Sequence, residues 1–108
     1  AINDFLTPHP YGASDLDFSK TTRIPAPSDT LFMAECADAY SSSDHFHFAD
    51  ESSGGFKPVY FAKDVAVTRH LTSANYLFAD SHVEALRWVV VKYRLVQPGA
   101  RFVRPDGQ

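Results

Sequence analysis

The second half of the chain shows the clearest alternation of hydrophobic and polar residues. Residues 65–70, 75–79 and 82–86 each approach a two-residue period, which is typical of strands that are buried on one face. Residues 71–74 and 80–81 separate these segments and have the composition of turns. The pattern therefore predicts an antiparallel meander of three strands with one apolar and one polar face.

The lengths of the two turns define the register of this predicted meander. A four-residue loop at 71–74 places Val67 opposite Phe78, and a two-residue loop at 80–81 places Phe78 opposite Val83. One face then collects most of the apolar side chains, which we expect to form the core. The core residues on which this prediction depends most are Val67, Tyr76, Phe78 and Val83.

The rest of the chain gives weaker patterns. The first thirty residues contain four of the seven prolines and are expected to be mostly irregular. Residues 30–37 have helical propensity, but their short length and the prolines before them favour a buried strand. Residues 38–57 form a polar loop in which His45-Phe46-His47-Phe48 predicts a short strand with both histidines on one face. The valine-rich run that ends at Val96 is expected to extend the last strand or to form another.

Length and composition indicate a single globular domain over residues 1–108. The 44% hydrophobic and 14% aromatic content is too high for a disordered segment. No apolar stretch exceeds the four residues of Trp88–Val91, far below the roughly 20 that a membrane-spanning helix needs. A net charge of -3 with ten Lys and Arg argues against a nucleic-acid-binding surface. The single cysteine, Cys36, lies in an apolar segment and is expected to be a small core residue.

The most specific pattern in the chain lies between residues 69 and 83. His70 is followed after nine residues by Asp80, with Ala74–Ala79 in between and His82-Val83 just beyond. This segment resembles the C-terminal signature of a large bacterial family of prepilin-like proteins, which is similar to the type II secretion pseudopilins. The signature of that family is His, nine residues and Asp-Gly, and Ser81 stands here in place of the Gly.

Two further segments carry the same resemblance. Residues Pro27–Glu35 resemble the Pro-Ser-x-Thr segment of the family, which runs into an apolar strand and an acidic residue. Ala1-Ile2-Asn3 resembles the end of the Tyr-x-x-Asn segment of the family. Under this resemblance the signature residues have structural roles, namely His70, Asn75, Asp80, Ser81 and His82.

The resemblance implies a fold, a function and a location. We expect a mainly β domain, an antiparallel β-meander sheet of pilin-like type with long irregular loops, which becomes α+β when an N-terminal helix is counted. The implied function is that of a non-catalytic structural or assembly subunit of a type II secretion or type IV pilus-like system. Its expected partners are other pseudopilin subunits or secretion-system proteins, with no nucleic acid among them. The chain begins at Ala1 without Met, so we expect it to be the C-terminal part of a longer protein.

That longer protein is expected to be anchored to the inner membrane through an N-terminal apolar helix. The domain itself would then lie in the periplasm or at the cell surface. Membrane contact is expected only through that helix, because the present sequence contains no span of its own.

The alternative hypothesis is a metal-binding domain or a metallohydrolase. His45 and His47 share a face of their predicted strand, and Asp44 and Asp50 are close in sequence, which suits Zn²⁺. A Ca²⁺ site is a second option, because the same loop is rich in oxygen ligands. The oxygen ligands considered for Ca²⁺ are Asp38, Ser43, Asp44 and Asp50. Neither pattern completes a known metal motif, and the simpler interpretation is a solvated loop.

Other candidate chemistry has a structural explanation as well. His70, Asp80 and His82 are candidates for ligands or acid–base groups, but the register separates His70 from Asp80 by about 17 Å. We therefore expect His70 to hydrogen-bond beside Asn75, and Asp80 to cap backbone N–H groups in a turn. The sequence contains no nucleophile elbow, and we do not expect an enzyme. A basic bias near the C-terminus is interpreted as a solvated strand face and comprises Arg87, Lys92, Arg94, Arg101 and Arg104.

Overall fold

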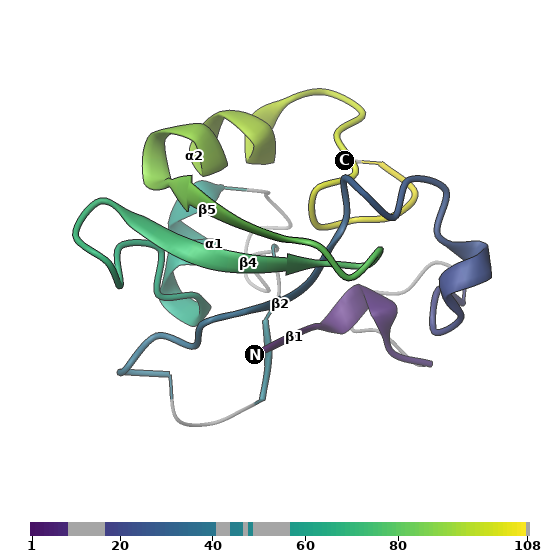
Figure 1. Cartoon of the computed structure of the whole chain (residues 1–108), viewed down its shortest axis with the longest axis horizontal. Helices are drawn as coiled ribbons and strands as arrows, with labels where there is room; N and C mark the ends of the chain where they lie inside the picture. The colour runs from purple at the N-terminus through teal and green to yellow at the C-terminus, as the bar shows by residue number, and fades with distance from the viewer. Residues whose placement is uncertain (9–16, 41–43, 47, 49–56, 108) are drawn as a thin grey trace.

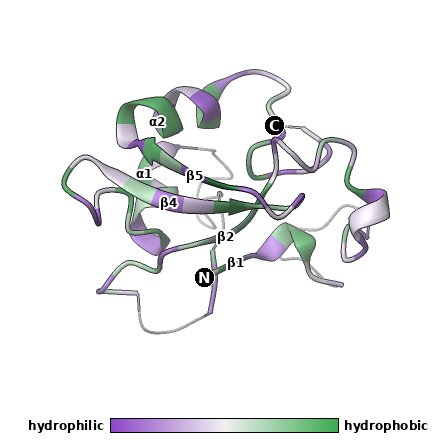
Figure 2. Cartoon of the chain, in the orientation of Figure 1, coloured by the Kyte–Doolittle hydropathy of each residue, from purple (hydrophilic) through white to green (hydrophobic). Residues whose placement is uncertain are grey.

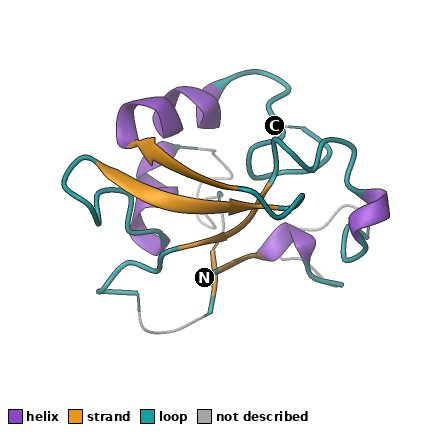
Figure 3. Ribbon diagram, in the orientation of Figure 1, coloured by secondary structure: helices purple, strands orange, loops and turns teal. Residues whose placement is uncertain are grey.

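The structure is a computed structural model that describes residues 1–8, 17–40, 44–46, 48 and 57–107. Figures 1 and 3 show how the helices and strands of this part of the chain are arranged. In chain order the elements are β1 (Ile2–Asn3), the 3-10 helices η1 (Asp4–Leu6) and η2 (Thr21–Arg23), β2 (Leu31–Ala34), β3 (His45–Phe46), α1 (Pro58–Asp64), β4 (Ser73–Phe78), β5 (Val83–Arg87) and α2 (Trp88–Val96). The fold is therefore α+β. None of the described helices is long and apolar enough to cross a membrane.

The five described strands form one mixed sheet in the order β3-β1-β2-β4-β5. Neighbouring strands are antiparallel except β1 and β3, which are parallel. The strand predicted within residues 30–37 is confirmed as β2, and Leu31 and Ala34 pair with Phe78 and Tyr76 of β4. The expected antiparallel meander is wrong in two respects, because β1 and β3 are parallel and because β4 lies between its neighbour β5 and the distant β2.

Residues 65–70 do not form the first strand of a meander. The chain before them forms α1, which begins at Pro58, and proline suits the first turn of a helix because that turn leaves N–H groups unpaired. After the helix, Val65 makes only an isolated bridge to Cys36. At His70 the chain turns sharply into β4. The alternation in this segment therefore accompanies a helix end and a turn, which the sequence pattern did not distinguish from a strand.

The valine-rich segment after β5 forms the helix α2 and not a strand. Val91 and Leu95 are four residues apart, so they lie on one side of the helix, and both are buried. Packing of this side against the sheet outweighs the β propensity of the valines. Lys92 and Arg94 therefore lie on a helix, which corrects the expectation of a basic strand face.

The hairpin of β4 and β5 exists, but its register differs by one residue from the predicted one. Leu77 lies opposite Val83, and the Phe78 N–H donates to the His82 carbonyl over 2.9 Å. The loop therefore has three residues, 79–81, and its last residue, Ser81, has a φ of 77°. As a result Val83 turns away from the core and is 63% exposed, so the prediction that it is a core residue is wrong.

The core lies between the sheet and the two helices. Tyr76, Phe78 and Val67 are buried in it, as predicted. Phe46 and Phe48 are also fully buried, and their rings contact the Phe61 ring of α1 edge-on, with centroids 5.5 and 6.4 Å apart. Figure 2 shows hydrophobic colouring at the arrowhead end of β4 and on parts of α2. We call the face of the sheet that carries Tyr76 and Phe78 the inner face, and the opposite one the outer face.

Candidate functional site

The two longest motif segments of the chain contact each other directly. The Ala79 N–H donates to the Thr30 carbonyl over 2.9 Å, and the Asp80 N–H donates to the Pro27 carbonyl over 3.2 Å. Thr30 is fully buried, and its hydroxyl donates to the Ala26 carbonyl over 2.9 Å. The turn that ends the His-to-Asp signature is therefore fixed against the segment Pro27–Thr30.

The histidine of the signature makes a second contact between the same segments. His70 Nε2 lies 3.2 Å from Glu35 Oε2 and 3.2 Å from Asn75 Nδ2. The Asn75 N–H donates to the same Glu35 oxygen over 3.1 Å. The predicted position of His70 beside Asn75 is confirmed. The contact with Glu35 was not predicted, because it depends on the pairing of β2 with β4.

Asn3 connects three segments that are distant in sequence. Its side chain is fully buried, and its Nδ2 donates to the carbonyls of Leu31 and Val103, both over 2.8 Å. Its Oδ1 accepts from the Phe5 N–H over 3.2 Å. A buried amide whose hydrogen bonds are made inside the protein is a structural element, because leaving those carbonyls unpaired is unfavourable. Asn3 thus joins β1, β2 and the C-terminal segment.

In the described part of the chain, ionisable groups cluster at and beside the loop of the β4–β5 hairpin. Asp80 Oδ1 accepts from the His82 N–H over 3.1 Å and also contacts His82 Nδ1. His82 Nε2 lies 3.2 Å from Glu84 Oε1, and Arg94 Nη1 lies 3.5 Å from Glu84 Oε2. The His82 ring stacks on the Phe78 ring, with centroids 4.3 Å apart and planes 9° from parallel.

These contacts change the proton affinities of two groups. The hydrogen bond from the His82 backbone N–H, aided by the imidazole, lowers the pKa of Asp80. The hydrogen bond to Asp80, aided by Glu84, raises the pKa of His82. The prediction that Asp80 caps a backbone N–H in the turn is confirmed. Both shifts favour the charged ion pair of Asp80 with His82.

The fold does not bring His70 and Asp80 of the signature together. His70 and Asp80 contact different residues, as the predicted separation implies. Three cavities of about 260 to 350 Å³ open on the described surface, and none is lined by His70, Asp80 or His82. Cys36 is half-buried, and its thiol donates to the Tyr40 carbonyl over 3.3 Å.

The metal hypothesis depends largely on residues outside the described part of the chain. His47, Asp50 and Ser43 are among those residues. Asp44 and His45 are described, and their Oδ1 and Nδ1 atoms lie 2.7 Å apart. The described ranges contain no group of three or more His, Cys, Asp or Glu residues that could hold a metal ion.

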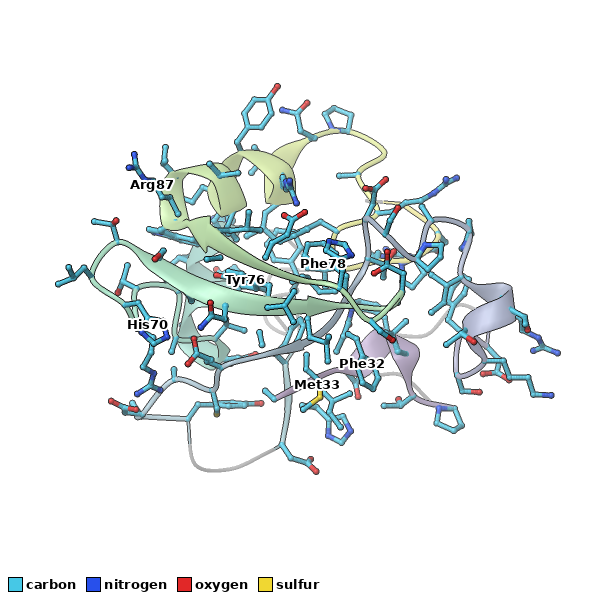
Figure 4. All side chains as sticks on the ribbon, viewed as in Figure 1. Phe32, Met33, His70, Tyr76, Phe78 and Arg87 are labelled. Carbon is cyan, nitrogen blue, oxygen red and sulfur yellow. The ribbon has the colours of Figure 1, made fainter. Side chains whose placement is uncertain are left out.

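The outer face of the sheet carries an apolar row that the predicted register had hidden. The pairings Ile2↔Met33, Met33↔Leu77 and Leu77↔Val83 place these residues side by side across β1, β2, β4 and β5. Met33 and Val83 are exposed, and Phe32 beside them is exposed as well. In Figure 4, Phe32 and Met33 lie on the side of β2 away from α2. We call Ile2, Met33, Leu77 and Val83 the outer row.

Comparison of the chain with protein-family models, with curated proteins and with solved structures finds no match. The resemblance to prepilin-like proteins therefore depends on the motif residues alone. Those motif residues, in three separate segments, are the ones that the hydrogen bonds described above bring together.

Proposed function

We propose that the chain is the globular domain of a pseudopilin-like protein, a non-catalytic subunit that assembles with other subunits in a secretion or pilus-like system. In this proposal the full-length protein is anchored to the inner membrane by an N-terminal helix, and the domain lies outside that membrane. Its partners are other pseudopilin subunits. The observation that carries the proposal is the set of contacts between the separate motif segments.

Those contacts supply a physical reason for the motif to exist. The turn at Ala79 and Asp80 is held by the carbonyls of Thr30 and Pro27, and His70 is held by Glu35. His70, Ala79 and Asp80 therefore each have a partner in another motif segment. Such a pattern is expected when a motif specifies a fold, whereas a catalytic motif is expected to place its polar groups around a substrate cavity.

The roles of the individual residues agree with a structural motif. Asp80 and Ser81 form the tight part of the loop, and Ser81 has the positive φ for which glycine is best suited. The Gly of the family signature would adopt that conformation without strain. The departure from the signature at Ser81 thus preserves the loop conformation and raises its conformational energy.

The proposal is tested with the full-length protein in the cells that produce it. The coding sequence before Ala1 is expected to encode an apolar helix of about twenty residues. The full-length protein is expected in the inner-membrane fraction, and chemical crosslinking followed by mass spectrometry is expected to identify other pseudopilin-type subunits bound to it. The matched control is an exported version that begins at Ala1, which should be released from the membrane and lose these crosslinks.

Two results would contradict the proposal. One is an upstream sequence without an apolar helix. The other is a membrane-bound protein whose crosslinked partners include no pseudopilin-type subunit.

A further inference from the structure

One of the three cavities on the described surface is lined by charged side chains of both signs. It has a volume of about 270 Å³ and lies between the segment before β2 and the turn after α2. Figure 1 shows the C-terminal segment, in yellow, beside the dark blue segment that leads into β2. The residues that line the cavity are Asp29, Arg94, Gln97, Ala100, Arg101 and Phe102.

Arg94 is already bound within the protein. Its Nη1 lies 3.5 Å from Glu84 Oε2, and its guanidinium carbon lies 5.6 Å from the centroid of the Phe102 ring. An arginine that pairs with a carboxylate and stacks on an aromatic ring is held in place by both contacts. Arg94 therefore forms a wall of the cavity, and Glu84 balances its charge.

Asp29 and Arg101 differ from Arg94 because neither has a partner for its charge in the described part of the chain. Both residues are exposed. Neither side chain forms an ion pair or a hydrogen bond with a described residue, and they do not pair with each other although they line the same cavity. The lining therefore offers one uncompensated negative charge and one uncompensated positive charge.

The backbone at both of these residues is held by hydrogen bonds. The Asp29 N–H donates to the Ala26 carbonyl over 3.0 Å. Arg101 lies between Ala100, whose N–H donates within the turn after α2, and Phe102, whose carbonyl accepts from the first residue of β2. A site whose backbone is fixed before binding loses less conformational freedom when a ligand arrives.

We propose that this cavity binds a small zwitterion, the class of molecule to which free amino acids and dipeptides belong. The guanidinium of Arg101 donates two parallel hydrogen bonds to the carboxylate of the ligand. The Asp29 carboxylate accepts from its ammonium group, and the Gln97 amide both donates and accepts. This inference goes beyond the proposed function and does not depend on it.

Two properties of the cavity favour this class of ligand over others. A ligand with a single charge would leave either Asp29 or Arg101 without a partner as water leaves the cavity, and removing an unpaired charge from water is unfavourable. The volume of about 270 Å³ is also slightly below the roughly 300–1,000 Å³ of sites for drug-sized molecules. A free amino acid or a dipeptide therefore suits the cavity in size as well as in charge.

An NMR titration of the purified, nitrogen-15-labelled chain with three related compounds tests the proposal. L-leucine has both charges, L-leucinamide lacks the carboxylate, and N-acetyl-L-leucine lacks the ammonium group; at about pH 6 the amino groups of the first two are protonated. We expect L-leucine to shift the signals of the Gln97 side-chain amide and the Ala100 N–H, with a Kd in the millimolar range. Each analogue is expected to bind at least about tenfold more weakly.

Two variants assign the two charges separately. Arg101→Gln is expected to weaken L-leucine binding about tenfold and to abolish its preference over L-leucinamide. Asp29→Asn is expected to have a similar effect on affinity and to abolish the preference over N-acetyl-L-leucine instead. Both positions are exposed, so both variants are expected to fold, which circular dichroism verifies. Arg87→Gln is the matched control and should bind like the wild type, since Arg87 is exposed and does not line the cavity.

Three results would overturn the inference. One is the absence of any shift of the Gln97 and Ala100 signals at about 50 mM L-leucine. Another is an analogue that binds the wild type as tightly as L-leucine does, which would assign the cavity to a singly charged ligand. The last is a wild-type pattern of preferences in both Arg101→Gln and Asp29→Asn. None of these results bears on the crosslinking of the full-length protein, so the proposed function stands or fails separately.

Discussion

The two faces of the sheet differ in burial, although the same strands form both of them. On the inner face, Tyr76 and Phe78 of β4 are buried against the helices and the C-terminal segment. On the outer face, Met33 of β2 and Val83 of β5 are exposed. The inner face therefore holds the domain together, and the outer face leaves apolar side chains at the surface of the described part of the chain.

The difference between the faces is a consequence of one residue of register. With the predicted two-residue loop, Val83 would share a face with Phe78 and belong to the core. The three-residue loop that ends in Ser81 instead places His82 opposite Phe78. An apolar side chain is thereby moved from the core to the surface, and a charged cluster lies over the edge of the inner face.

The largest effect is expected from shortening a side chain on the inner face. Phe78→Ala removes a ring that is 1% exposed and contacts Phe102, so we expect a loss of about 3–5 kcal/mol in the free energy of unfolding. Leu77→Ala, the next residue on the outer face, is the control and should cost about 1 kcal/mol or less. Urea denaturation measures both, and equal losses would contradict the division between the faces.

A smaller loss is expected when the buried amide of Asn3 is removed. Asn3→Ala leaves the carbonyls of Leu31 and Val103 without their donor, which should lower the free energy of unfolding by about 1–3 kcal/mol. Asn75→Ala is the matched control, because the Asn75 side chain is exposed. If both variants unfold at the same urea concentration as the wild type, Asn3 does not have the structural role assigned to it.

Substitutions at Ser81 test the conformation of the loop 79–81, which sets the register of β4 and β5. Because its φ is 77°, Ser81→Gly should remove backbone strain and raise the free energy of unfolding by about 1 kcal/mol. Ser81→Val should lower it, since a β-branched residue is strained at this φ. Thermal melting distinguishes the two directions. A destabilised Ser81→Gly variant would show that the loop has another conformation.

The smallest effect is a dependence of stability on pH through the loop. The pKa of His82 is raised above its usual 6.5, so its contribution is present below pH 6.5 and is lost as the pH rises through the raised value. The pKa of Asp80 is lowered below its usual 3.8, so its contribution is present above pH 3.8 and is lost on acidification. The joint contribution of His82 and Asp80 to the free energy of unfolding is therefore largest between pH 3.8 and pH 6.5.

Comparing the wild type with His82→Gln isolates the contribution of the His82–Asp80 ion pair to stability. The difference between the two melting temperatures should be largest near pH 5 to 6 and shrink toward pH 8. The other charged groups near His82 are Glu84 and Arg94, which both variants keep. A difference that stays constant from pH 5 to pH 8 would contradict the ion pair of His82 with Asp80.

The sequence was sufficient to identify the elements whose signals are local. The strand at 31–34, the strand at 75–79 and the turn at 80–81 all follow from short apolar segments and turn residues, and all three occur within a few residues of their predicted positions. The helices α1 and α2 were missed because their valines and aromatic residues favour strands. Packing against the sheet decided their structure, and Pro58 was the one local sign of a helix start.

In the candidate site, too, local contacts could be predicted from the sequence and contacts between distant segments could not. The neighbours His70 and Asn75, and Asp80 and His82, were predictable because each pair lies within one hairpin. The contacts of Glu35 with His70 and of Thr30 with Ala79 join segments about 35 to 50 residues apart, and a single sequence contains no direct signal for the β2–β4 pairing that creates them. The outer row was hidden by the one-residue error in register.

The most direct test of the division between the two faces uses the only methionine in the chain, Met33. Carbon-13 labelling of its methyl group gives a single NMR signal from the centre of the outer row. We predict that a soluble paramagnetic agent broadens this signal in the folded wild type, because Met33 is 38% exposed. A signal that the agent leaves unchanged in the folded wild type would contradict the assignment of Met33 to an exposed outer face.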